Sequence, residues 1–143
     1  MQIDGYTPAD PHIATEVGVE LEYSTKFGKI HIRARSTGKD NTEFRKAAEK
    51  LNRRREISEK LALAARVPVD NHLQETLGLW FDTVVMSWST TIKSDGKEVK
   101  PSRETFIALL SSDVLMPIFG MLIDDCADAS NFTKQADEDA AKN

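Results

Sequence analysis

Two runs of alternating apolar and polar residues constrain the fold of this chain more than any other feature. Between residues 16 and 35, apolar side chains fall at every second position, with one short interruption. This period of two is typical of strands with one buried face. Glu20 and Glu22 can face Arg33 and His31 across such a pair, which favours antiparallel pairing. We therefore predict a β-hairpin over residues 16–35. Because a lone hairpin is marginally stable in water, its apolar face must pack on helices or on another chain.

From Asp40 onward the spacing of apolar residues changes to three and four, which predicts helices. Their expected ranges are about 41–66, 71–88, 103–111 and 113–129. Polar residues suited to N-capping lie at the start of each: Asp40, Asn41 or Thr42; Asp70 or Asn71; Ser102; and Ser112 or Asp113. Pro117 falls in or near the first turn of the last helix, where proline is tolerated. Asp95-Gly96 indicates a tight turn in a loop or short hairpin between the second and third helices.

The apolar faces of these helices differ in width. The second helix has a wide aromatic face with Trp80, Phe81 and Trp88, which we expect at the centre of the core. The first helix has a narrow stripe, interrupted around residues 53–56, that consists of Phe44, Ala47, Ala48, Leu51, Ile57, Leu61, Ala64 and Ala65. Together the elements carry more apolar surface than one small bundle easily buries, so part of it could form a protein-binding groove. The sequence leaves core and groove as alternatives.

The two ends of the chain lack this patterning. Residues 1–15 contain two prolines and no periodicity, and we predict an extended N-terminal arm. Residues 133–143 are polar and acidic, and we predict a flexible tail. Residues 16–132 then form a single globular domain, which a chain of 143 residues is long enough to build. The expected fold class is α+β and mainly α, with the N-terminal hairpin packed on a bundle of about four helices.

Several functional classes lack the residues they require. Cys126 is the single cysteine, which excludes an internal disulfide and a four-cysteine zinc site. No apolar run approaches the length of a membrane span, and the N-terminus lacks signal-peptide features, so we expect a cytoplasmic protein without membrane partners. His12, His31 and His72 lie in different segments without ligand spacing. Asp124, Asp125 and Asp128 are most simply a solvated helix surface. We therefore expect neither enzymatic activity nor a metal or cofactor.

The net charge of −4 conceals an uneven distribution. Residues 41–66 contain eight basic and four acidic residues, whereas residues 124–143 contain two basic and six acidic ones. The candidate partner-binding residues are Lys46, Lys50, Arg53, Arg54 and Arg55. They could bind an acidic protein or phosphates, or they could form a solvated face with pairs such as Glu49–Arg53 and Arg55–Glu59. The absence of interleaved aromatic residues disfavours nucleic acid. The basic helix and acidic end could also pair between copies, which predicts a possible homo-oligomer.

An ordered set of features resembles the tail assembly chaperones of long-tailed bacteriophages, the small proteins encoded just ahead of the tape measure protein. The resemblance spans residues 44–143 and rests on order and spacing. Its features are Phe44-Arg45 and the Arg-rich turn, Val84-Val85-Met86-Ser87-Trp88, Asp95-Gly96-Lys97, Pro101-Ser102-Arg103-Glu104, Asn131-Phe132, and an acidic end with Lys142-Asn143.

The resemblance implies a non-enzymatic protein that coats the tape measure protein and helps recruit major tail protein subunits of the tail tube. Such a protein works in the host cell cytoplasm and is absent from the mature virion. Two alternatives stay open. A hairpin with a free edge and an N-terminal arm would suit a structural tail tube or connector protein. The basic helix would suit a small nucleic-acid-binding regulator.

Overall fold

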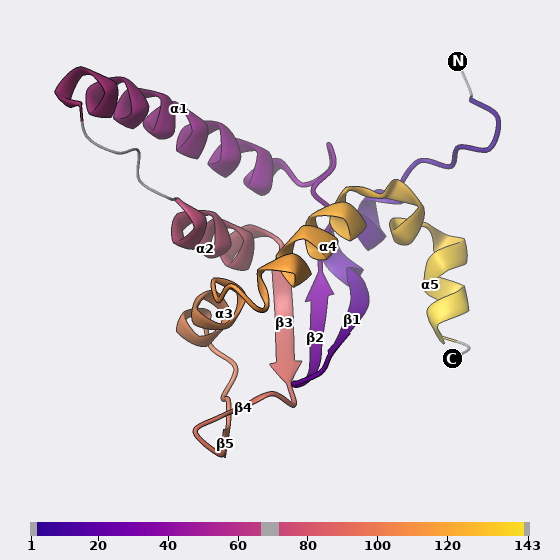
Figure 1. Cartoon of the computed structure of the whole chain (residues 1–143). Helices are drawn as coiled ribbons and strands as arrows, with labels where there is room; N and C mark the ends of the chain where they lie inside the picture. Colours follow the sequence, from indigo (N-terminus) through magenta and orange to yellow (C-terminus); the bar gives the residue numbers. More distant parts are fainter. Residues whose placement is uncertain (1–2, 67–71, 142–143) are drawn as a thin grey trace.

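The computed structural model describes residues 3–66 and 72–141 and has an α+β fold that is mainly helical (Figure 1). Its strands form a three-stranded sheet and a small second hairpin: β1 (Val19–Thr25), β2 (Gly28–Ala34), β3 (Val85–Thr90), β4 (Lys93–Ser94) and β5 (Lys97–Glu98). Its helical elements are η1 (Ile13–Val17), α1 (Thr42–Ala65), α2 (Leu73–Thr83), α3 (Arg103–Leu110), α4 (Met116–Ala127), η2 (Ala129–Phe132) and α5 (Lys134–Ala141). The predicted combination of an N-terminal hairpin with a helical bundle is confirmed.

The hairpin has the predicted register. β1 and β2 pair antiparallel, with Glu20 opposite Arg33 and Glu22 opposite His31. Arg33 Nη1 lies 3.0 Å from Glu20 Oε1, and His31 Nε2 lies 3.9 Å from Glu22 Oε1. The alternation therefore sorts charged side chains to one face of the sheet and apolar side chains to the other.

The predicted helix over 71–88 is wrong in its last residues. α2 ends at Thr83, and Val85–Thr90 form strand β3, which pairs antiparallel with β2 and places Trp88 opposite Ile32. Val84, Val85 and Trp88 fit a helical spacing, but β-branched residues also suit strands. The edge of β2 that does not pair with β1 offers backbone hydrogen bonds to residues 85–90, and this pairing favours the strand over the helix. The predicted caps Asp70 and Asn71 lie outside the described residues.

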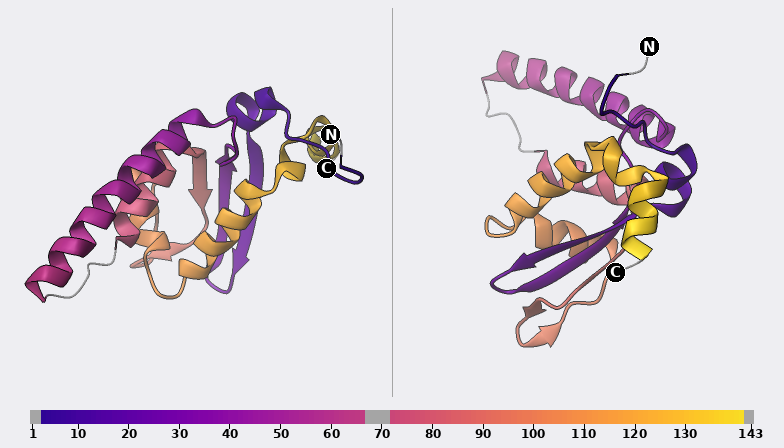
Figure 2. Two further views of the ribbon diagram at one scale, coloured as in Figure 1. Left: turned by 90° about the horizontal axis from the view of Figure 1, so that it is seen from above. Right: turned by 90° about the vertical axis from the view of Figure 1, so that its right-hand side faces the viewer.

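The core lies between the sheet and helices α2, α3 and α4, which cover one face of it (Figures 1 and 2). Trp80 packs edge-to-face on both Phe44 of α1 and Phe119 of α4, with ring centroids 5.5 and 5.4 Å apart. Trp88 of β3 packs on Phe106 of α3 at 5.7 Å. Trp80 and Trp88 are buried and Phe81 is half-buried, so the aromatic residues lie at the centre of the core as expected.

Both ends of the chain contain helical structure that the sequence analysis does not predict. The arm predicted over 1–15 is wrong at its C-terminal end, because Asp10 Oδ1 accepts from the backbone N–H groups of His12 and Ile13 and the chain enters η1. Ile13 and Ala14 pack there on Phe132 of η2. The flexible tail predicted over 133–143 is helical over 134–141, which form α5. No side chain of α5 is buried.

The predicted N-caps hold for α1 and α3 but not for α4. Asn41 Oδ1 accepts from Phe44 N at 3.0 Å, which confirms Asn41 as the cap of α1. Ser102 forms a capping box with Thr105 at the start of α3. The predicted start of the last helix at 113 is wrong, because α4 begins at Met116 with Leu115 at the N-cap position and no side-chain cap. Pro117 lies in its first turn, as predicted. Asp95 and Gly96 have positive φ values of 53° and 76° and form the β4–β5 turn. None of the helices in the described residues is long and apolar enough to cross a membrane.

Candidate protein-binding surface

Helix α1 is anchored at its N-terminal half and projects beyond the rest of the molecule at its C-terminal half (Figures 1 and 2). Phe44 packs on Trp80, and Leu51 is the one buried residue of the helix. From residue 56 to residue 66, every side chain except that of Ala62 is exposed. The projecting half is therefore displayed to partners.

Four of the five predicted partner-binding residues lie on the side of α1 that faces away from α2. With 100° between successive residues, positions 46, 50, 53, 57 and 61 form one row opposite Phe44 and Leu51, and position 54 flanks it. All six side chains are exposed. We define the outer face of α1 as Lys46, Lys50, Arg53, Arg54, Ile57 and Leu61. It is basic toward its N-terminal end and apolar toward its projecting end.

Arg55, the fifth predicted residue, does not belong to this face. Its guanidinium group donates hydrogen bonds to the His72 carbonyl oxygen at 3.1 Å and to Thr76 Oγ1 of α2. Its side chain is half-buried between the two helices. Arg55 therefore joins α1 to the N-terminal end of α2, while its neighbours Arg53 and Arg54 are exposed.

The basic residues of the outer face are not neutralised within the helix. Among the described residues, the salt bridges lie in the sheet, at the start of α2 and between Arg103 and Asp82. The pairs Glu49–Arg53 and Arg55–Glu59, which the solvated-face alternative would contain, are not among them. Arg53 and Arg54 therefore present their positive charge to solvent.

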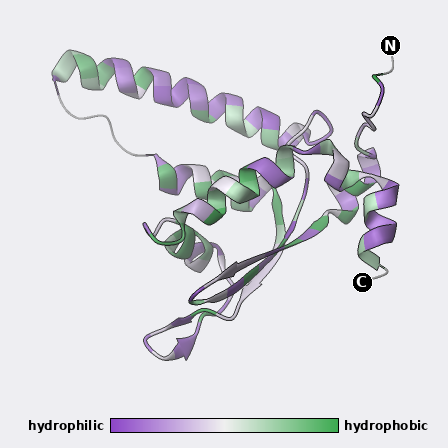
Figure 3. Ribbon diagram, turned by 45° about the vertical axis from the view of Figure 1, so that its right-hand side comes forward, coloured by the Kyte–Doolittle hydropathy of each residue, from purple (hydrophilic) through white to green (hydrophobic). Residues whose placement is uncertain are grey.

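Two apolar residues expected in the stripe of the first helix lie outside the core. Ile57 is 60% exposed and Leu61 is 66% exposed, so of the two alternatives that the sequence leaves open, core and exposed surface, the structure places both residues at the surface. In space, α1 extends beyond the N-terminal end of α2, which contacts Arg55, so its projecting half has less of the fold to pack on (Figure 1). Figure 3 shows apolar segments interrupting the polar surface of α1 toward its free end.

Helix α4 exposes a second apolar surface. It buries Ile118, Phe119, Leu122 and Cys126 against the core. We define its outer face as the exposed residues Met116, Pro117, Gly120, Met121, Ile123 and Asp124. Met121 is 50% exposed, and a Cβ atom built on Gly120 would meet nothing within 4 Å. This face is apolar over most of its length and acidic toward the C-terminal end.

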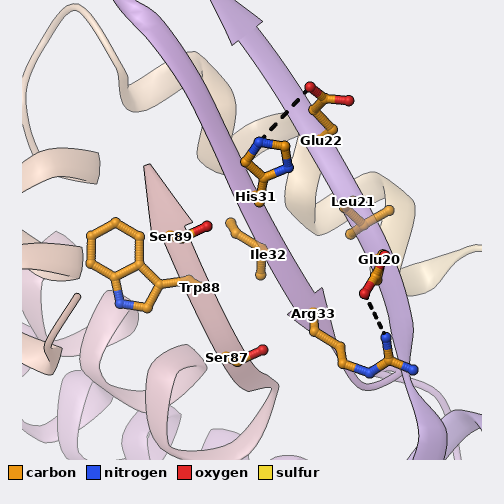
Figure 4. Close-up of a pocket in the computed structure, with 9 residues that line it drawn as sticks. All are labelled: Glu20, Leu21, Glu22, His31, Ile32, Arg33, Ser87, Trp88 and Ser89. Atoms are coloured by element: carbon orange, nitrogen blue, oxygen red, sulfur yellow. Dashed lines mark hydrogen bonds and ion pairs between the residues drawn. The ribbon is translucent and has the colours of Figure 1, made fainter. Parts of the chain in front are cut away.

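The open face of the sheet forms a shallow hollow of about 460 Å³ (Figure 4). Its charged residues are already paired, either with one another or with the neighbouring Lys29. Arg33 pairs with Glu20, while Lys29 Nζ lies 3.1 Å from Glu22 Oε1, and this hydrogen-bonded lysine holds the pKa of Glu22 below its usual value. The mutual pairing of these charges makes the hollow a weaker candidate for binding than the helical faces.

The groups that could perform chemistry are buried or dispersed. Cys126 is fully buried, and burial raises the pKa of its thiol to about 12, which keeps the thiol protonated and unreactive. Within residues 3–66 and 72–141, no group of three or more His, Cys, Asp or Glu side chains is placed to hold a metal ion. The exposed helical faces are suited to binding another protein.

The outer face of α4 is not among the surfaces predicted from the sequence. Met116, Met121 and Ile123 are 43%, 50% and 39% exposed there. One signal was present, because apolar residues occur on all sides of this segment and one helix face cannot bury them all.

Comparisons with protein-family models, with curated proteins and with solved structures find no match for this chain.

Proposed function

We propose that this protein is a tail assembly chaperone of a long-tailed bacteriophage. It would bind the tape measure protein, keep it soluble in the host cell cytoplasm and help recruit major tail protein subunits before leaving the growing tail. The observation that carries the proposal is the projecting half of α1, which exposes Ile57, Leu61 and Leu63 beside unpaired basic residues. A protein that covers aggregation-prone helices needs apolar surface with a polar rim.

The identity of the client comes from the resemblance. In the fold, several of the sequence segments on which the resemblance rests have a structural role. Phe44 anchors α1 on Trp80, Asp95-Gly96 forms a turn, and Ser102 caps α3. Phe132 is fully buried and holds η2 against η1. These residues position the helices whose outer faces are exposed.

Co-expression in bacteria with the tape measure protein encoded by the same genome tests this proposal. We expect the tape measure protein to move into the soluble fraction and to co-purify with the chain. A variant with Arg53→Glu and Arg54→Glu should retain less of it. The matched control carries Lys93→Glu and Lys97→Glu, an equal charge change on the exposed β4–β5 hairpin, and should behave as the natural sequence. The proposal fails if the tape measure protein is equally insoluble with and without this chain.

A structural role in the particle is the second candidate, because β1 and β3 are edge strands of the sheet. A neighbouring subunit could extend either edge. Mass spectrometry of purified particles separates the two roles. A chaperone is absent from the particle, whereas a tail tube or connector protein is present in many copies.

A further inference from the structure

We propose that the outer face of α1 docks antiparallel on the outer face of α4 of a second copy of this chain, so that copies associate head to tail. The inference does not depend on the identity of the client. The contact uses the same face of α1 that the proposed function offers to the client, so self-association and client binding are alternatives for this face. It also replaces the acidic C-terminal end with α4 as the main partner of the basic helix.

The two faces carry the same two properties in opposite order. Along α1 the outer face is basic first, at Arg53 and Arg54, and then apolar, at Ile57 and Leu61. Along α4 it is apolar first and then acidic, ending in Asp124. An antiparallel arrangement therefore places basic against acidic residues and apolar against apolar residues in a single register.

The spacing of the two faces also agrees. Arg53 and Leu61 are separated by eight residues, as are Met116 and Asp124. At about 1.5 Å per residue, each interval spans about 12 Å of helix. When Arg53 lies opposite Asp124, Leu61 consequently lies opposite Met116.

The same register places Ile57 opposite Gly120. Ile57 is 60% exposed, and the space in which a Gly120 side chain would lie is empty within 4 Å. A branched side chain opposite a glycine lets two helices approach closely, because the side chain fills the space above the glycine.

A second copy fits these faces better than an unrelated partner does, because both complementary surfaces occur on every copy. Each chain offers one α1 face and one α4 face, so the contact is heterologous, and a heterologous contact repeats into a ring or an open row. Exposed charge pairs make the association sensitive to salt.

Sedimentation velocity over a concentration series tests for association in the isolated protein. We expect a mass that rises with concentration and falls when salt is added. Leu61→Ser should weaken association by about tenfold or more, since burial of a leucine side chain stabilises by roughly 1.5–3 kcal/mol. Leu63→Ser is the matched control, because Leu63 is 81% exposed but lies off the outer face, and it should change nothing. A monomer at all concentrations overturns the proposal.

Cysteine cross-linking tests the register. Two single variants, Ile57→Cys and Gly120→Cys, are mixed and oxidised, and we expect disulfide-linked heterodimers. The control mixture contains Leu63→Cys and Gly120→Cys and should yield few. Equal yields from both mixtures overturn the proposed contact, as does a predominance of Ile57→Cys homodimers, which would indicate α1–α1 pairing.

Charge exchange separates specific pairing from general attraction. Arg53→Glu and Asp124→Lys should each weaken association, and an equimolar mixture of the two variants should restore it, because each mixed contact again joins opposite charges. Failure of the mixture to restore association overturns the pairing of Arg53 with Asp124. If the chain is monomeric alone but Ile57→Cys cross-links to co-expressed tape measure protein, the face belongs to the client. The self-association proposal then fails while the proposed function stands.

Discussion

The hydroxyl group of Tyr23 donates a hydrogen bond to Asp125 Oδ2 over 2.7 Å and so joins strand β1 to helix α4, 102 residues later in the chain. We expect Tyr23→Phe to lower the free energy of unfolding by about 1–2 kcal/mol, because a hydrogen bond to a charged group is lost and the ring still fills the core. Urea denaturation at neutral pH measures this loss. Asp124→Asn, one residue away on the exposed side of α4, is the control and should have little effect.

The same contact predicts a loss of stability at alkaline pH. Burial, followed by the hydrogen bond to Asp125, raises the pKa of Tyr23 well above its ordinary value of 10.0. The folded state therefore keeps the phenolic proton that the unfolded chain releases, and this contribution is complete below pH 10 and declines above it. Denaturation between pH 9 and 11 should show a steeper loss for the natural sequence than for Tyr23→Phe. Equal slopes would contradict this prediction.

Asn41 joins three segments, and its replacement should be costly. Its side-chain oxygen caps α1, and its Nδ2 group donates to the carbonyl oxygens of Ser36 at 2.9 Å and Thr83 at 3.0 Å. We expect Asn41→Ala to destabilise by about 2–4 kcal/mol, since a cap is lost and two buried acceptors lose their donor. Asn41→Ser keeps a capping oxygen and should recover about 1 kcal/mol of the loss in thermal or urea unfolding.

Gly18 should be more sensitive to substitution than Gly96. Both have positive φ values, of 73° and 76°. A Cβ atom on Gly18 would lie 2.6 Å from Met86 Sδ and 2.8 Å from the carbonyl oxygen of Ala34, whereas one on Gly96 meets nothing within 4 Å. Gly96→Ala should cost about 1 kcal/mol from backbone strain alone. Gly18→Ala should cost clearly more, and equal melting temperatures for the two variants would contradict the close contact with the backbone of Ala34.

The three consecutive arginines should respond differently to replacement by alanine. Arg53 and Arg54 are exposed and outside any salt bridge among the described residues, so we expect changes within about 0.5 kcal/mol. Arg55→Ala removes hydrogen bonds to His72 and Thr76 and should destabilise by about 1–2 kcal/mol. For protein association we expect the reverse: Arg53→Ala and Arg54→Ala should weaken it more than Arg55→Ala does. Measurement of DNA binding by the same variants tests the nucleic-acid alternative, which predicts lower affinity for Arg53→Ala.

Cys126 should be unreactive in the folded protein. Its thiol is fully buried, and its pKa is raised to about 12. A thiol-specific chromogenic reagent at pH 8 should therefore label the native protein slowly and the urea-unfolded protein at once. Leu63→Cys provides an exposed thiol for comparison. Fast labelling of the natural sequence under native conditions would show that this end of α4 opens readily.

Features that depend on residues close together in the sequence were predictable, and features that depend on distant residues were not. The register of Glu20 with Arg33, the cap at Asn41 and the turn at Asp95-Gly96 all depend on residues close in sequence or on a single hairpin, and all were predictable. The strand Val85–Thr90 was not, because its identity depends on pairing with β2, more than fifty residues earlier. For the candidate site, the sequence identified the basic helix but not which arginine turns inward.

The sequence by itself determined the hairpin, the starts of α1 and α3 and the separation of basic and acidic segments, because alternation, capping and charge act between near neighbours. Only the tertiary structure decided that Ile57 and Leu61 are exposed, that Arg55 binds α2 and that α4 displays an apolar outer face. Burial depends on which other elements cover a helix face. Which elements cover a face depends on contacts between residues far apart in the chain. The helical spacing of apolar residues is the same whether the face is covered or exposed, so the spacing alone does not reveal burial.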